Sequence, residues 1–260
     1  MTTLTLATWN VNSLKVRLEH VLSWLAGRDD IDALVLQETK LTDDKFPQGE
    51  LALAGWESVF YGQPTYNGVA LLTRPDRVTV SDVTLGMPGY ADDQKRYLSA
   101  TVTPVGTTES VRFAGVYCPN GMEAGSRKYL YKLDWFHALR RAMRAERAKN
   151  ERVVLAGDFN IAPADADLWN PQTWPDKIRD LSARPWSVFF RTGLSMPSGP
   201  FRKRKSSSPG GTTAWRPTSK TTVCESTSCS QAMRCVRRSK PVKSTKRRGP
   251  GRNPLTTRPS

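Results

Sequence analysis

Cysteine, histidine and long apolar runs are all scarce in this 260-residue sequence. Four cysteines in so long a chain exclude the class of small, disulfide-rich secreted domains. No run of about 18 apolar residues occurs, so we expect no membrane-spanning helix and no membrane partner. The first residues lack a charged segment followed by an apolar one, and we therefore expect no signal peptide and a cytoplasmic location.

Histidine and cysteine also give no sign of a transition-metal site. His20 and His137 fall on predicted helices outside any catalytic motif, so we expect ordinary surface roles for both. Cys224, Cys229 and Cys235 lack the spacing of a zinc site. The sequence therefore predicts no zinc.

Acidic residues are scarce in the last third of the chain. Residues 1–175 hold 19 Lys and Arg against 21 Asp and Glu, a net charge of −2, whereas residues 176–260 hold 20 against 3, a net charge of +17. The second segment has few large apolar groups with which to offset roughly 1–2 kcal/mol of backbone entropy per residue. We predict two regions: the N-terminal two-thirds of a folded domain over residues 1–178, and a basic, largely disordered tail over residues 179–260.

Strand and helix patterns alternate through the first region. Strands are predicted over residues 3–9, 33–36, 56–61, 69–73, 97–103, 111–117 and 152–157. A helix is predicted from Ser13 as N-cap to Gly27, and a second one over residues 127–149. One side of the second helix is lined by Leu130, Leu133, Phe136, Leu139 and Met143. This alternation predicts an α/β domain in which helices cover packed sheets.

Polar clusters follow three of the predicted strands. They are Trp9-Asn-Val-Asn12, Gln37-Glu-Thr-Lys40 and Gly157-Asp-Phe-Asn160. Ligands of open α/β sheets favour the carboxyl ends of strands, and carboxylate and carboxamide oxygens in one cleft suit a hard cation such as Mg²⁺. Taken singly, Asn10 is typical of a turn or cap, Glu38 of a solvated strand end and Asp158 of a loop. Together the clusters favour a metal and phosphate site.

Five segments in order give the sequence a family resemblance. They are Leu6-Ala-Thr-Trp-Asn-Val-Asn-Ser-Leu14, Leu36-Gln-Glu-Thr-Lys40, Tyr66-Asn-Gly-Val-Ala-Leu-Leu-Thr73, Gly115-Val-Tyr-Cys-Pro-Asn-Gly121 and Leu155-Ala-Gly-Asp-Phe-Asn-Ile161. Over about 160 residues the chain resembles the exonuclease III and abasic-site endonuclease family of repair nucleases. The resemblance implies a four-layer α/β sandwich of two packed, mainly antiparallel sheets with outer helices. Because the likeness ends near residue 178, we expect that sandwich to be incomplete at the C-terminus, with core strands lacking partners on one side.

The resemblance also implies roles for six residues. Glu38 would be the principal ligand of Mg²⁺ or Mn²⁺, with Asn10 beside it. Asp158 would orient or deprotonate the attacking water, and Asn160 would hold the phosphate. Tyr117 would donate a hydrogen bond to the scissile phosphate or the leaving oxygen, and Asn120 would add a phosphate contact.

The reaction implied by these roles is phosphodiester hydrolysis. The implied partner is double-stranded DNA with abasic sites or 3′ ends, and the expected state is a monomer. Arg96 is expected to be a solvated surface residue, with contact to DNA as the alternative.

The sequence departs from the family pattern after about residue 178. The family's aromatic Phe-Ser-Trp-Trp-Asp-Tyr-Arg stretch, its Gly-Leu-Arg-Ile-Asp and its Ser-Asp-His are absent, and no histidine follows His137. If each codon began one nucleotide earlier, residues 208–215 can read FSWWDYRM, residues 221–227 NHGLRID and residues 254–259 PSDHTP. The hypothesis is a one-nucleotide frameshift between about Lys177 and Trp186, whether a mutation or an error in the reported bases.

Two classes of function follow. The first is the repair nuclease, which we expect to be nearly inactive in the chain as written because the C-terminal Asp and His are missing. The alternative is a non-enzymatic chain whose basic tail binds nucleic acid through phosphates alone, independently of sequence and with a steep dependence on salt.

Overall fold

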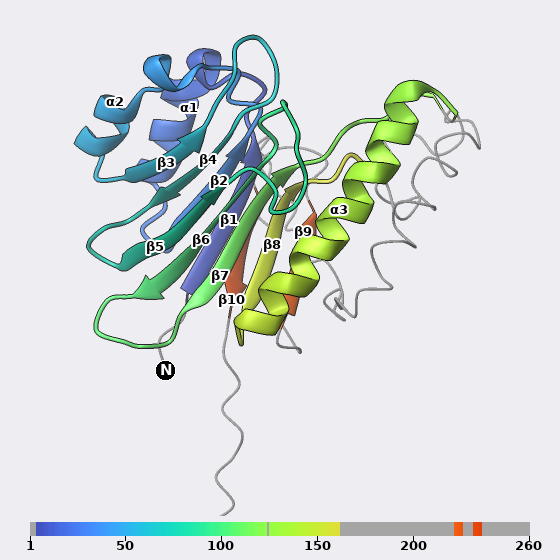
Figure 1. The fold of residues 1–260 in the computed structure, drawn as a ribbon. Helices are drawn as coiled ribbons and strands as arrows, with labels where there is room; N and C mark the ends of the chain where they lie inside the picture. Colours follow the sequence, from blue (N-terminus) through green and yellow to red (C-terminus); the bar gives the residue numbers. More distant parts are fainter. Residues whose placement is uncertain (1–3, 124, 162–220, 226–230, 236–260) are drawn as a thin grey trace, which may run out of the picture.

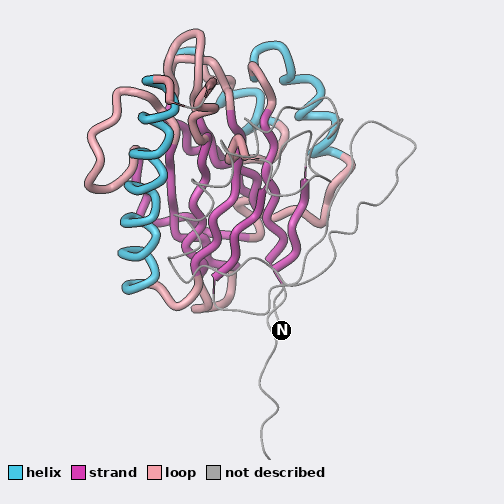
Figure 2. Tube along the Cα trace, turned by 90° about the vertical axis from the view of Figure 1, so that its right-hand side faces the viewer, coloured by secondary structure: helices cyan, strands magenta, loops and turns pink. Residues whose placement is uncertain are grey.

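Two five-stranded β-sheets packed face to face form the centre of the molecule, with helices on their outer surfaces (Figures 1 and 2). The structure is a computed structural model and describes residues 4–123, 125–161, 221–225 and 231–235. Five of the eight strand pairs are antiparallel and three are parallel. The predicted four-layer sandwich with mainly antiparallel sheets is therefore confirmed.

The first sheet has the strand order β10-β1-β2-β4-β3. Its strands are β1 (Leu4–Asn10), β2 (Ala33–Gln37), β3 (Glu57–Tyr61), β4 (Val69–Thr73) and β10 (Gln231–Cys235). The helices α1 (Leu14–Ala26) and α2 (Gln48–Leu53) and the short 3₁₀ helix η1 (Asp43–Lys45) belong to the same half. All residues of β2 are buried, and the apolar run from Ala33 to Leu36 is typical of a strand covered on both faces.

The second sheet has the order β5-β6-β7-β8-β9. Its strands are β5 (Val78–Leu85), β6 (Tyr97–Pro104), β7 (Val111–Tyr117), β8 (Val153–Asp158) and β9 (Thr221–Glu225), and the helix α3 (Arg127–Lys149) covers its outer face. The sequence patterns did not predict β5, α2 or η1. In β5 a register shift between Ser81 and Thr84 interrupts the alternation by which a strand is identified.

Three apolar layers hold the sandwich together. The central layer joins the facing sides of the two sheets and includes Leu6, Val35, Leu98 and Phe113. An outer layer lies between the first sheet and α1, and another lies between the second sheet and α3. Full burial of each such side chain contributes about 1.5–3 kcal/mol, so these layers supply most of the stabilisation of the fold.

The buried face of α3 differs from the predicted one in two ways. Phe136, Leu139 and Met143 are buried as expected, but Leu130 is 55% exposed. Lys132, which the pattern assigned to the solvated side, is 1% exposed. The helix is therefore rotated toward the loops that follow β7 and β8.

The tail contributes one strand to each sheet. The strand β10 pairs antiparallel with β1, and β9 pairs parallel with β8. Our expectation that the core strands would lack partners is wrong for these two edges, because backbone pairing is open to almost any sequence. The rest of the predicted tail, and the boundary near residue 178, lie outside the described residues.

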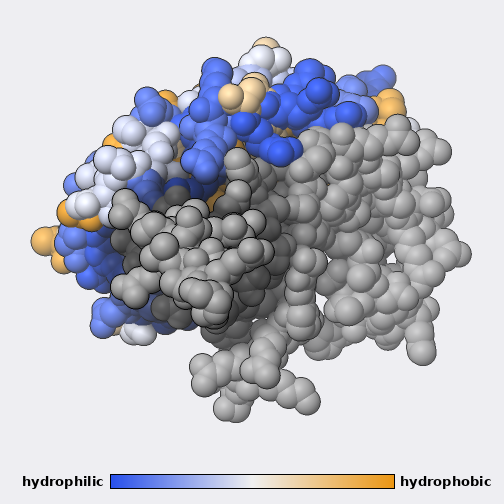
Figure 3. Space-filling model, turned by 90° about the horizontal axis from the view of Figure 1, so that it is seen from below, coloured by the Kyte–Doolittle hydropathy of each residue, from blue (hydrophilic) through white to orange (hydrophobic). Residues whose placement is uncertain are grey.

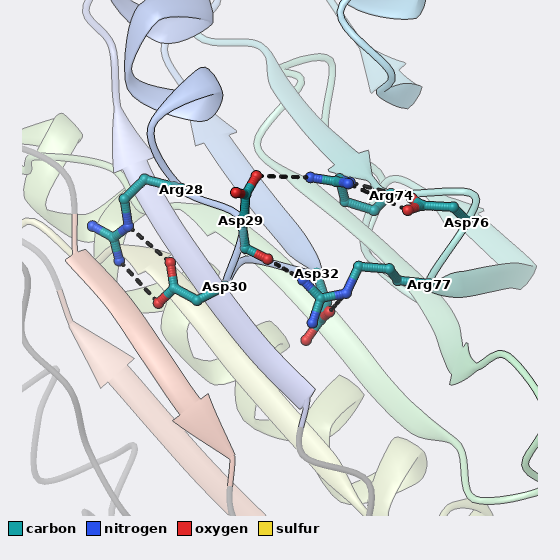
Figure 4. A network of polar contacts seen from close by, with 7 residues as sticks. All are labelled: Arg28, Asp29, Asp30, Asp32, Arg74, Asp76 and Arg77. Carbon is teal, nitrogen blue, oxygen red and sulfur yellow. Dashed lines mark hydrogen bonds and ion pairs between the residues drawn. The ribbon is translucent and has the colours of Figure 1, made fainter.

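Charged residues gather where β1 and β2 begin (Figure 4). The carboxylate of Asp32, directly before β2, accepts from Thr5 N at 2.5 Å and pairs with Arg77 Nε at 2.8 Å. Arg74 pairs with Asp76 at 3.2 Å and with Asp29 at 3.8 Å. From below, the described surface is mostly hydrophilic (Figure 3), and no helix of the described residues is long and apolar enough to cross a membrane.

Candidate active site

The carboxyl ends of β1, β2, β7 and β8 bring five of the six predicted site residues into one contact network. Asn10 ends β1, Glu38 follows β2, Tyr117 ends β7, and Asp158 ends β8, with Asn160 two residues later. These strands lie in two different sheets. The site therefore spans the interface between the sheets, and it forms only when both halves of the sandwich pack.

One amide group joins the two carboxylates of the site. Asn10 Nδ2 donates to Glu38 Oε1 at 2.7 Å and to Asp158 Oδ2 at 2.8 Å. Glu38 is 28 residues from Asn10 along the chain and Asp158 is 148 residues away. Residues this distant in sequence meet at one point, as the clusters at the strand ends predicted.

The carboxylate of Glu38 is surrounded by donors. Lys40 Nζ lies 3.1 Å from Glu38 Oε2, and the Tyr117 hydroxyl also donates to this carboxylate. Burial alone would raise the pKa of Glu38, but the hydrogen bonds from Asn10, Lys40 and Tyr117 and the charge of Lys40 outweigh it, so the pKa lies below its ordinary value. Glu38 is thus ionised near neutral pH, as a metal ligand requires.

The carboxylate of Asp158 lies in a different environment. Asp158 is only 9% exposed, and burial raises its pKa above the ordinary value, although Asn10, the Asn160 amide and the charge of Lys132 act in the opposite direction. A raised pKa makes a carboxylate a better proton acceptor. The pKa values of the two acids are therefore shifted in opposite directions, as is typical of carboxylates with different chemical tasks.

Tyr117 is held as a neutral hydrogen-bond donor. Burial first, and then the negative charge and hydrogen bond of Glu38, raise the pKa of its phenol above the ordinary value. Arg96 Nη1 donates to Tyr117 O at 3.1 Å, and the Arg96 guanidinium carbon lies 4.9 Å from the centre of the Tyr117 ring. Arg96 is therefore partly buried at the site, and our expectation of a solvated surface residue was wrong.

The backbone at the site adopts unusual conformations. Glu38, Lys40 and Asn160 have φ angles of 55°, 54° and 51°. Each residue of this kind costs about 1–3 kcal/mol unless its surroundings fix it, and such residues cluster at functional sites. Here Lys40 N donates to Asn67 O at 2.9 Å, and Asn160 N donates to Asp158 Oδ1 at 2.9 Å.

Gly157 shows how closely the backbone packs beside Asp158. Its φ is 149°, and a Cβ atom there would lie 1.9 Å from Val116 O. No side chain fits at that distance, so only glycine allows β8 to approach β7 in this way. The glycine of the Gly-Asp-Phe-Asn segment thus sets the backbone position from which the Asp158 side chain extends.

Asn120 and Asn160 have different positions. Asn160 Nδ2 donates to Cys118 O at 2.8 Å, which ties the end of β8 to the end of β7. Asn120 is exposed at the rim, and its backbone oxygen accepts from Lys132 Nζ at 3.2 Å. Lys132 itself was missed by the sequence analysis, because a lysine at a helical position is usually on the solvated face.

The donor set suits a hard divalent cation. Among the described residues no group of three or more His, Cys, Asp or Glu is placed to hold a metal ion. Mg²⁺, however, typically takes one or two carboxylates and completes its shell with water and phosphate oxygens. Two carboxylates that meet at the amide of Asn10 fit that requirement in residue type.

Comparison with known proteins shows which family this chain resembles. The family model described as "Endonuclease/Exonuclease/phosphatase family" matches residues 7–224. Exodeoxyribonuclease III of Haemophilus influenzae is 29% identical over 163 residues, 62% of this chain and 58% of that protein. Exodeoxyribonuclease of Bacillus subtilis is 29% identical over 170 residues, 64% of this chain and 62% of that protein. The chain thus spans about six-tenths of the length of these curated relatives.

Solved structures extend the likeness to three dimensions. The 3′-5′ exonuclease NExo from Neisseria meningitidis is 43% identical, with a TM-score of 0.65, over 74% of this chain and 72% of that one. An AP endonuclease from Archaeoglobus fulgidus is 30% identical, with a TM-score of 0.56, over 71% of this chain and 70% of that one. Together with the match over most of its length, these likenesses show that the chain belongs to the endonuclease/exonuclease/phosphatase family.

Proposed function

We propose that this chain carries the site of a DNA repair phosphodiesterase that depends on a divalent cation. The observation that carries the proposal is the single Asn10 amide that holds Glu38 and Asp158 together at the interface of the two sheets. The names of the relatives, exodeoxyribonuclease III and AP endonuclease, support DNA as the substrate. The proposed substrates are duplex DNA with abasic sites or with 3′ ends.

Glu38 and Asn10 would hold the cation, which we propose to be Mg²⁺ or Mn²⁺. When bound, such an ion neutralises phosphate charge and activates water for attack. Glu38 suits this role because its donors keep it ionised. The backbone oxygen of Glu38 also accepts from Ser13 N at 2.7 Å, which ties the residue after β2 to the segment after β1.

The other site residues would act on the phosphate and the water. Asp158 accepts a proton from the attacking water, a task supported by its raised pKa. Asn160 binds the phosphate and helps to place the water. Tyr117 donates from its neutral hydroxyl to the phosphate or the leaving oxygen, and Asn120 adds a contact from the rim.

The chain as written is proposed to bind metal and DNA but to cleave slowly. The Asp and His that the family supplies from its C-terminal segment are missing from this reading frame, and so is the aromatic stretch. Without them the scissile phosphate lacks the histidine that the resemblance implies would act on it. We propose that the frameshift between about residues 177 and 186 is the cause.

The experiment compares this chain with the product of a gene in which a one-nucleotide change restores the other frame. Both are assayed on an end-labelled abasic duplex and on a 3′-recessed duplex with Mg²⁺, with Mn²⁺ and with EDTA. We expect metal-dependent cleavage from the restored protein and little from this chain. Family-typical rates from this chain would contradict the slow-cleavage proposal, and an inactive restored protein would contradict the nuclease assignment.

A non-enzymatic role in nucleic-acid binding is the second candidate, favoured by the net charge of +17 in residues 176–260. Binding of this kind would follow the number of phosphates contacted and weaken steeply with salt. Asp158→Ala separates the two candidates, because it should abolish cleavage and leave binding by the tail unchanged. The expected cytoplasmic location and monomeric state belong to the proposal, and cell fractionation and light scattering test them.

A further inference from the structure

The most deeply buried charged side chain of the described residues outside the carboxylate network is Lys132, on the second turn of α3. It is 1% exposed and belongs to the largest fully buried side chains. An ammonium group taken out of water is costly unless hydrogen bonds compensate it. Packing alone therefore does not explain why Lys132 is buried, and its hydrogen-bond partners have to compensate the loss of water.

The ammonium group of Lys132 reaches both of the loops that carry phosphate-contacting candidates. We call residues 118–121 the β7 loop and residues 159–161 the β8 loop. Lys132 Nζ donates to Asn120 O at 3.2 Å in the β7 loop and to Asn160 O at 2.6 Å in the β8 loop. One side chain thus fixes the backbone of two loops that belong to different strands.

The β7 loop is shaped to accept this lysine. Gly121 has a φ of 86°, and a Cβ atom there would lie 2.7 Å from Lys132 Cδ. The absence of a side chain at Gly121 leaves room for the lysine stem. Ser126, the N-cap of α3, donates from Oγ to Gly121 O at 3.1 Å, so the start of the helix holds the same loop a second time.

We propose that Lys132 is a positioning residue, which sets Asn120 and Asn160 for phosphate binding by clamping the β7 loop to the β8 loop. This inference rests on the proposed function for the identity of the ligand, but the clamp itself is a property of the free protein. The strained φ of 51° at Asn160 is what such a clamp has to maintain. Glu38 and Asn10 lie on the other sheet, so the clamp acts on phosphate binding and leaves the principal metal ligand in place.

The first test is amide hydrogen exchange on the full chain without metal or DNA. The amides of Cys118 and Asn160 donate to Asp158 O at 2.8 Å and to Asp158 Oδ1 at 2.9 Å, and both report on the clamp. Lys132→Met keeps the length of the side chain and removes both hydrogen bonds. Exchange in the two loops should rise about tenfold, with β1 to β4 unchanged. Equal exchange in the two proteins would overturn the clamp.

The control for charge is Lys128→Met, an exposed lysine one turn earlier on the same helix. It removes the same charge and should leave exchange in both loops unchanged. Where Lys132→Met fails to fold, Lys132→Gln takes its place, because its NH2 group lies on a stem one atom shorter and cannot reach both loop carbonyls, and the same two outcomes apply.

The second test measures the gain in affinity that Mn²⁺ gives for a short abasic duplex. Because any binding by the basic tail through phosphates would not need metal, this gain reports on the site. In Lys132→Met the gain in duplex affinity that Mn²⁺ gives should be about tenfold smaller than in the parent chain, while the affinity for Mn²⁺ itself stays the same. In Lys128→Met both quantities should equal those of the parent chain. The same gain in Lys132→Met and the parent chain would overturn the positioning role. Failure of the proposed function looks different, because then the parent chain itself gains nothing from Mn²⁺ while the exchange result stands.

Discussion

The two ends of β1 and β2 hold buried carboxylates in opposite ways. Where the strands begin, Asp32 accepts from the Thr5 amide and pairs with Arg77, with Arg74 close by (Figure 4). Where they end, Glu38 and Asp158 share the amide of Asn10. The first arrangement sets guanidinium groups against a single carboxylate, and the second brings two carboxylates to one amide, with only Lys40 as an ion-pair partner of Glu38.

The difference separates a stabilising end from what we propose is the functional end. At the second end burial raises the pKa of Asp158, so its ionised form costs stability in the folded state, and Glu38 and Asn160 beside it have positive φ angles. Burial also raises the pKa of Asp32, but there the Thr5 amide, Arg77 and Arg74 oppose the rise from within the protein. Substitutions at the first end should therefore change stability, and substitutions at the second should change binding.

The largest expected change in stability comes from Asp32→Ala. It leaves the Thr5 amide and Arg77 without the carboxylate that both contact. We expect a loss of about 2–3 kcal/mol in the free energy of unfolding, measured by urea denaturation, with unchanged Mn²⁺ affinity. Asp30→Ala is the matched control, since that carboxylate is 63% exposed. If Asp32→Ala lost no more free energy of unfolding than Asp30→Ala, the first end would not be the stabilising one.

Glu38→Gln is the corresponding change at the functional end. The new amide can still accept from Asn10, but it lacks the charge that a divalent cation requires. Mn²⁺ affinity measured by calorimetry should fall by about 10–100-fold, while the free energy of unfolding changes by less than about 1 kcal/mol. Glu57→Gln, an exposed glutamate of the same sheet, should leave the affinity unchanged. An unaltered affinity in Glu38→Gln would show that the cation binds elsewhere.

Much of this fold was open to prediction because its strands and helices have regular apolar patterns. The helix α3 has the predicted bounds Arg127–Lys149, and β4 has the predicted bounds Val69–Thr73. The strand β5 escaped prediction because its bulge near Asp82 breaks the alternation. The strands β9 and β10 escaped because backbone pairing with an exposed edge leaves little trace in a sequence.

The site was predictable to the extent that it follows strand ends. Asn10, Glu38 and Asp158 could be placed because each follows a predicted strand by one or two residues at most. Arg96 and Lys132 could not, since the fold and not the neighbouring sequence decides that one stacks on Tyr117 and the other turns inward. From residue type alone both are expected to be surface cations. Their places in the site are visible only in the packed structure.

A smaller effect of opposite sign is expected from Asp158→Asn without metal. Burial raises the pKa of Asp158, so the ionised form costs stability in the folded state. The amide removes that cost, but it has one oxygen where the carboxylate uses both to accept from Asn10 and from the Asn160 amide, so the variant should be more stable at neutral pH by less than about 1 kcal/mol. As the pH falls through the folded-state pKa, the parent carboxyl becomes neutral and the difference should shrink. Thermal unfolding at several pH values in EDTA measures it, and a variant less stable at neutral pH would contradict the argument.

The smallest change is expected from Arg28→Ala at the stabilising end. Arg28 Nε pairs with Asp30 Oδ1 at 3.0 Å, and its guanidinium carbon lies 5.0 Å from the centre of the Trp24 ring. Because Asp30 is mostly exposed, water screens the pair, and we expect a loss below about 1 kcal/mol that diminishes further in high salt. Arg28→Lys keeps the charge, and its free energy of unfolding should lie between those of the parent chain and of Arg28→Ala. A loss as large as that of Asp32→Ala would mean that the charges of Figure 4 act as one cooperative network, and that the stabilising end extends beyond the single buried carboxylate.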